Sequence, residues 1–130
     1  MKRLAVLILF LCASTQAMAA DLCTTLNHKT LKVNANGFTG ATVGEILLQG
    51  PRNGTYSFQM MINIYGEVDK MKGTCKDGHV VFTRTQVGVF VQEYDGWIFQ
   101  RNPSGMAGVF NHNNSPKQYG WYGTYEVAAK

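Results

Sequence analysis

The sequence has 130 residues, is 45% hydrophobic and 15% charged, and carries a formal net charge of +4. Without the first twenty residues, this length is enough for one small domain and no more. Outside the first residues the basic side chains form no cluster along the sequence, so nucleic acid is not an expected partner.

Residues 1–20 have the pattern of a secretory signal peptide. Two basic residues precede an uncharged run over 4–13, and Ala17-Met18-Ala19 offers a small-x-small cleavage site. The apolar run is too short to span a bilayer, so no stable membrane anchor is expected. Removal of this segment leaves ten basic residues against eight acidic ones in a domain over 21–130. We expect an exported protein, periplasmic or extracellular, with a bacterial-type signal.

Two cysteines remain in the predicted mature domain, because Cys12 lies within the signal peptide. Cys23 and Cys75 would meet an oxidising compartment, where a structural disulfide is expected. The chain-entropy model gives such a bridge roughly 4 kcal/mol. Neither cysteine belongs to a CxxC motif, and the three histidines lack ligand spacing, so no metal site and no cofactor are predicted.

The mature sequence shows alternation with a period of two and turn residues about every ten positions, without helical periodicity. Eight strands are predicted, at residues 28–34, 43–50, 55–65, 69–76, 79–85, 89–100, 106–112 and 119–127. Short connections in sequence order predict an all-β, single-domain fold, an eight-stranded up-and-down antiparallel barrel with one disulfide. Closure of such a barrel removes exposed strand edges.

Turn lengths predict which residues face each other inside this barrel. A three-residue loop over 52–54 sets Leu48 opposite Phe58 and Ile46 opposite Met60. A two-residue Asp77-Gly78 turn pairs the inward residues of its flanking strands: Cys75 with Val80, Gly73 with Phe82, and Met71 with Arg84. A loop over 86–88 pairs Arg84 with Phe90, Phe82 with Gln92, and Val80 with Tyr94. A five-residue loop over 101–105 pairs Gly96 with Phe110 and Ile98 with Gly108.

These registers orient the strand over 89–100. Its predicted inward residues are Phe90, Gln92, Tyr94, Gly96 and Ile98, and its outward residues are Val89, Val91, Glu93, Asp95, Trp97 and Phe99. The last strand is expected to point Trp121, Gly123, Tyr125 and Val127 inward and Tyr122, Thr124 and Glu126 outward. The same topology places both predicted disulfide cysteines at one end of the barrel.

The opposite end is the first candidate site. Its predicted residues are Arg84, Phe90, Gln92, Tyr94, His112 and Trp121. A buried arginine needs an acceptor, and no acidic residue lies on the predicted inward face. A small ligand with an acidic or carbonyl group would supply that acceptor. Alternatively, Arg84 closes the barrel end, satisfied by water or loop carbonyls, and Gln92 and Tyr94 bond each other in a filled core.

The outward face of the same strand is the second candidate site. Val89, Val91, Trp97 and Phe99 would expose more apolar area than a monomer usually leaves bare. This favours a protein partner, as in an inhibitor, an immunity-type protein or a subunit, or a homo-oligomer. Alternatively, the register is wrong by one residue and these side chains are core. No catalytic constellation is recognisable, so enzyme activity has no support in the sequence.

The signal peptide, the glycine-rich hairpins and the late Gly-Trp-Tyr strand together resemble calycin-type barrels, the avidin-like and lipocalin-like proteins. This resemblance covers most of the mature chain, rests on architecture rather than on motifs, and carries over no family site. The segments QEYDGWIF, MAGVF and GWYGTYE look like those of a recurrent exported bacterial barrel. From the whole sequence we expect an exported barrel that binds, rather than transforms, its target. No Gly-x-Trp opens the first strand, and two tryptophans are fewer than an avidin places around biotin, so biotin binding is not implied.

Overall fold

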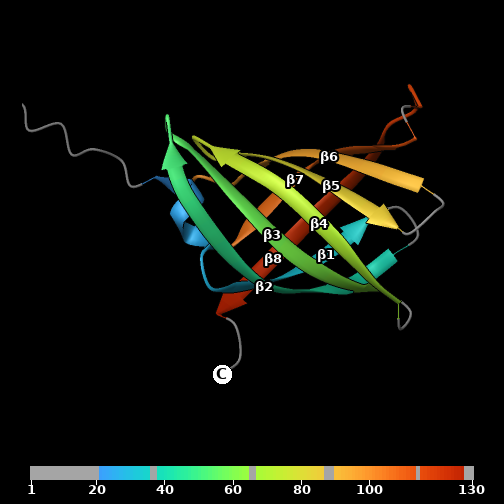
Figure 1. The fold of residues 1–130 in the computed structure, drawn as a ribbon, viewed down its shortest axis with the longest axis horizontal. Coiled ribbons are helices and arrows are strands. Elements are labelled where there is room, and N and C mark those ends of the chain that lie inside the picture. Colours follow the sequence, from blue (N-terminus) through green and yellow to red (C-terminus); the bar gives the residue numbers. More distant parts are fainter. Residues whose placement is uncertain (1–20, 36–37, 65–66, 87–89, 114, 128–130) are drawn as a thin grey trace, which may run out of the picture.

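The computed structural model describes residues 21–35, 38–64, 67–86, 90–113 and 115–127. The predicted signal peptide therefore lies outside the described residues. One 3-10 helix and eight strands follow one another: η1 (Leu22–Leu26), β1 (Lys29–Ala35), β2 (Phe38–Arg52), β3 (Thr55–Ile64), β4 (Glu67–Lys76), β5 (His79–Gln86), β6 (Phe90–Ile98), β7 (Gly105–His112) and β8 (Tyr119–Val127). The strands form a closed antiparallel barrel in sequence order, with β1 pairing β8 (Figure 1). The predicted fold class is confirmed, and the closed eight-stranded barrel is consistent with calycin-like architecture.

The helix η1 lies at the end of the barrel where β2 and β4 finish (Figure 1). Asp21 caps it by accepting a hydrogen bond from the Cys23 amide at 3.0 Å, and Leu26 at its other end is buried. The predicted disulfide is confirmed, because Cys23 is bonded to Cys75 of β4 with an S–S distance of 2.06 Å. Among the residues that the structure describes, no helix has the length and apolar character needed to cross a lipid bilayer.

Side chains fill the described interior of the barrel. At its centre the rings of Phe82 and Tyr94 stack with centroids 4.6 Å apart, and Phe110 stacks on the other face of Tyr94 at 5.0 Å. Trp121 meets Phe82 edge-on at 5.3 Å, and all four residues are buried. Barrels of eight strands have an interior just wide enough for side chains to fill, and this one has a layered aromatic core.

The hairpin between β2 and β3 has the predicted pairing of Leu48 with Phe58, but not the predicted loop. The turn has two residues, because Arg52 pairs directly with Thr55. The extra residue lies in a bulge between Gln49 and Arg52, where Gly50 has a φ of 106°. Such a bulge is where a strand tolerates the adjacent Pro51, which cannot donate to the ladder.

A second register shift, between Val43 and Leu47, interrupts the ladder where the pairing of Ile46 with Met60 was predicted. Both of these side chains are nevertheless buried, as predicted. The pairings predicted around the Asp77-Gly78 turn are confirmed without change.

Two later pairings were predicted two residues out of register. Arg84 faces Gln92 rather than Phe90, which also sets Phe82 opposite Tyr94 and Val80 opposite Gly96. Across the next hairpin, Gly96 faces Gly108 rather than Phe110, and Ile98 faces Met106. The observed register joins Arg84 to Gln92 and stacks the rings of β5 on those of β6, contacts that the predicted register would lose.

The facing glycines admit the indole of Trp121. A Cβ on Gly96 would lie 2.6 Å from Cζ2 of Trp121, and a Cβ on Gly108 would lie 1.8 Å from the carbonyl oxygen of Asp95. The indole nitrogen donates to the carbonyls of Asp95 at 3.2 Å and Val109 at 3.1 Å. Only glycine leaves room for this approach.

A shift of two residues preserves which face each side chain occupies. Gln92, Tyr94, Gly96 and Ile98 are therefore buried as predicted, and Val91, Glu93, Asp95, Trp97 and Phe99 are exposed as predicted. The predicted orientations of the last strand are likewise confirmed for residues 121–126.

Candidate binding surfaces

Arg84 already has an acidic partner inside the barrel. Its Nη2 and Nε lie 2.5 and 2.7 Å from Oδ2 of Asp69, and the two side chains are only 4% and 5% exposed. The prediction that the inward face lacks an acidic residue is therefore wrong. Asp69 lies two residues before the inward Met71, so the period-2 pattern of β4 contained the signal.

The ion pair continues into a chain of hydrogen bonds across the barrel. Nη1 of Arg84 donates to Oε1 of Gln92 at 2.9 Å, and the Tyr94 hydroxyl donates to the same oxygen at 3.0 Å. Nε2 of Gln92 lies 3.2 Å from Nδ1 of His112, which is half-buried. We call Asp69, Arg84, Gln92, Tyr94 and His112 the polar network. Its polar groups are paired, as buried polar groups in proteins usually are.

Burial raises the pKa of Tyr94 to about 12, although the Arg84 guanidinium acts in the opposite direction. The phenol is therefore neutral at physiological pH and serves as a hydrogen-bond donor. This suits a structural role for the hydroxyl, since a phenol with a raised pKa is a poor source of phenolate for catalysis.

The six residues predicted for the ligand site are brought together in part. Four inward positions join the aromatic core or the polar network, namely Arg84, Gln92, Tyr94 and Trp121. His112 joins at the half-buried end, while Phe90 begins β6 opposite Gln86 and its side chain lies outside the described set. The ligand prediction stays a prediction, but its premise, an arginine without an acceptor, no longer holds.

The outer surface of β6–β8 carries a group of exposed rings. Trp97, Phe99 and Tyr122 are 57%, 46% and 56% exposed, and we call these three residues the aromatic patch. Trp97 and Tyr122 both pair with Ala107 of β7, while the Phe99 ring lies against Gly105. The small residues Ala107 and Gly105 therefore lie between the three exposed rings.

Neighbouring side chains hold Trp97 in position. The His79 ring stacks on the indole with centroids 4.6 Å apart and an interplanar angle of 21°. Nε2 of His79 in turn lies 2.8 Å from Oδ1 of Asp95. An exposed tryptophan held this way loses less conformational freedom when a partner binds.

The predicted interface residues do not all meet. Val91 is exposed, but six positions along β6 separate it from Trp97, a distance of about 20 Å for an extended strand. Val89 lies outside the described residues. The prediction omitted Tyr122, although the same pattern had placed it outside, because only registers across two hairpins reveal that it flanks Ala107.

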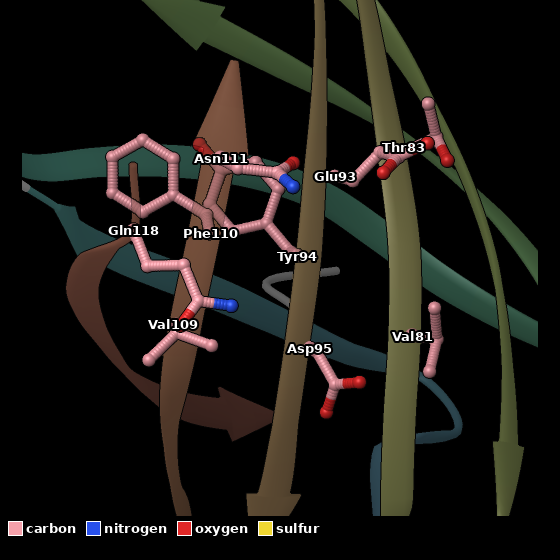
Figure 2. Close-up of a pocket in the computed structure, with 9 residues that line it drawn as sticks. All are labelled: Val81, Thr83, Glu93, Tyr94, Asp95, Val109, Phe110, Asn111 and Gln118. Carbon is pink, nitrogen blue, oxygen red and sulfur yellow. The ribbon is translucent and has the colours of Figure 1, made fainter. Parts of the chain in front are cut away.

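A groove of about 340 Å³ lies next to the patch, on the outside of β5, β6 and β7 (Figure 2). Asp95 lies between Val81 and Val109 in this groove, and Glu93 lies beside Thr83. Oδ1 of Asn111, another residue of the lining, is buried and has no hydrogen-bond partner among the described residues. The groove is therefore acidic, and the side chains that flank its two carboxylates are small.

The described residues contain no group of three His, Cys, Asp or Glu side chains that could hold a metal ion. Comparison of the chain with protein-family models, with curated proteins and with solved structures gives no match.

Proposed function

We propose that this chain is an exported binding protein that recognises a partner protein with its outer face rather than with the inside of the barrel. The aromatic patch carries the proposal. Tryptophan and tyrosine are the residues that most often dominate binding energy at protein interfaces, and here two of them flank a floor of small residues. A partner side chain of apolar character would enter between the rings and rest on Ala107.

The packed interior supports the same choice. The arginine that would hold an anionic ligand is neutralised by Asp69, and the aromatic core occupies the centre of the barrel. The buried disulfide suits a protein that works in an oxidising compartment. A relationship with calycin-type proteins is part of this proposal and rests on architecture alone.

Site-specific photo-crosslinking in the producing cell tests the proposal. A photo-reactive phenylalanine analogue at position 97 or 122 should give an adduct of one discrete mass with a second protein. The matched control positions are 47 and 68, because Leu47 and Val68 are as exposed as the patch residues but lie on β2 and β4. Equal adducts at the control positions would overturn the proposal. So would adducts that contain only a second copy of this chain, because the patch would then have no different protein as its partner.

A small ligand at the opposite end is a second candidate. One observation favours it: His112 lies half-buried at this end of the barrel, beside the rings of Phe110 and Tyr119 at 5.3 and 5.6 Å. A small ligand with a carboxylate or carbonyl group would lie against these rings. Thermal stabilisation by a panel of small carboxylates, lost in His112→Ala, would support the idea, while an unchanged melting temperature across the panel would remove it.

A further inference from the structure

The outer surface on either side of β5 separates charge by strand. Lys70, Lys72 and Lys76 point outward from β4 and are exposed, and the outward acidic residues of β6 are Glu93 and Asp95. The outward residues of β5 between them are Val81, Thr83 and Thr85, which are short and uncharged, and His79, which lies beside Lys76 and is bonded to Asp95. We call the three lysines the basic ridge.

The register aligns one ridge lysine with an acidic residue of β6, while Lys70 and Lys76 fall in the rows of Val91 and Trp97. Lys72 pairs with Thr83, and Thr83 pairs with Glu93, so the three residues form one row across β4, β5 and β6. Within the part of the chain that the structure describes, no ion pair involves a ridge lysine or Glu93. These charges are therefore available to a second molecule.

We propose that the chain forms a symmetric dimer in which the β5 strands of two copies face each other. If the two-fold axis lies in the interface and runs parallel to β5, then β4 of one protomer faces β6 of its partner. Residues of the same row stay at the same position along the strand direction. Lys72 of one protomer then faces the partner's Glu93, and symmetry repeats the contact on the other side. Each copy supplies both halves of an isologous interface, the commonest arrangement in homo-oligomers.

The charge pattern also excludes the other way of stacking the two faces. An axis in the interface but across the strands would set β4 against β4, with lysine opposite lysine, and β6 against β6, with carboxylate opposite carboxylate. Like charges placed together across an interface cost several kcal/mol. The separation of charge by strand thus selects one axis.

The shape of the surface fits this arrangement. A barrel curves away on both sides of β5, so contact at β5 needs short side chains and contact at β4 and β6 needs long ones. Val81 and Thr83 are short, while Lys72 and Glu93 are long. The groove beside β5 offers about 340 Å³ for the incoming ridge.

The dimer does not depend on the aromatic patch. Phe99 lies beyond the end of β6 and Tyr122 lies on β8, so both stay outside the β5-centred contact. Trp97 shares a row with Lys76 and His79 and faces the partner's Lys76 in the dimer, so position 122 tests the patch independently of the dimer. Failure of the dimer would leave the patch as proposed, and loss of patch crosslinks would leave the dimer.

Sedimentation equilibrium of the purified protein tests the dimer through charge reversal. At low ionic strength the average mass should rise toward twice that of one chain with concentration, and it should fall back at high salt. Lys72→Glu alone and Glu93→Lys alone should each stay monomeric. An equimolar mixture of the two variants, and the variant with both reversals in one chain, should regain the twofold mass.

The matched controls are Lys32→Glu and Glu126→Lys, on β1 and β8, since β1 is the strand farthest around the barrel from β5. These should dimerise like the native protein, and unchanged circular dichroism should establish that every variant is folded. A native protein that stays monomeric at all concentrations would overturn the proposal. So would single reversals that leave the mass unchanged, or a mixture that stays monomeric.

Discussion

Asp69→Asn should destabilise the protein by about 3–5 kcal/mol, the usual cost of removing one partner of a buried ion pair. The substitution keeps the size of the side chain and removes the charge that faces Arg84. At separations of 2.5 and 2.7 Å the lost attraction is about 6 kcal/mol with an effective dielectric constant of 20. The amide oxygen retains part of it as a hydrogen bond of about 1 kcal/mol.

Urea denaturation followed by tryptophan fluorescence would measure this loss, since a domain of this size has about 5–15 kcal/mol of stability in total. Arg84→Met alone should also be costly, because it leaves the Asp69 carboxylate buried without a counter-charge. The double variant should be more stable than Asp69→Asn, since an apolar side chain then replaces the unpaired cation, and Gln92 keeps its bond from Tyr94.

Two results would refute this reasoning. One is a loss below 1 kcal/mol for Asp69→Asn, which would mean that water or another group already compensates the arginine. The other is strict additivity of the two single changes in the double-mutant cycle, because two groups in direct contact must show a coupling energy.

Three further predictions concern the core and the disulfide. The folded-state pKa of Tyr94 lies at about 12, above the ordinary value of 10. The contribution of this phenol to the free energy of unfolding is therefore complete below pH 10 and is lost as pH rises toward 12, by about 3 kcal/mol at most. Denaturation midpoints measured against pH should fall less steeply at alkaline pH for Tyr94→Phe than for the native protein, and equal profiles would contradict this. Gly108→Ala should cost 2 kcal/mol or more in chemical denaturation, because the new methyl meets the backbone of β6, whereas Gly120→Ala, with open space around it, should be near neutral; equal effects would refute the packing argument. Replacement of both Cys23 and Cys75 by serine should lower stability by roughly 4 kcal/mol; a melting temperature unchanged by reducing agent in the native protein would count against this.

The sequence predicted which side of the sheet each side chain occupies better than it predicted which residue lies opposite on the neighbouring strand. Alternation assigns each side chain to one side of the sheet, and this parity survives a register change of two residues. Loop length decides the neighbour, and a sequence does not show whether an extra residue lies in a loop or in a bulge, as at Gly50. The pairings of Arg84 and Gly96 were therefore wrong although their orientations were right.

The candidate sites depended on the same distinction. Asp69 was predictable from the parity of β4, since it shares the inward face with Met71. The row that joins Trp97, Ala107 and Tyr122 was not, because it requires correct registers across two hairpins in succession. Likewise, the basic ridge is scattered along the sequence and becomes a surface only when β4 is placed beside β5.

The pairing of β1 with β8 has a kinetic consequence. The seam joins residues 29–35 to residues 121–127, so nearly the whole domain must be present before the barrel can close. Until then β1 and β7 are open edges with unsatisfied amides, and such long-range pairing makes folding slow and exposes the chain to aggregation. The bond from Cys23 to Cys75 needs only the first half of the barrel. A chain that emerges with its N-terminus first can therefore make that bond early and hold β1 near β4 while the last strands arrive.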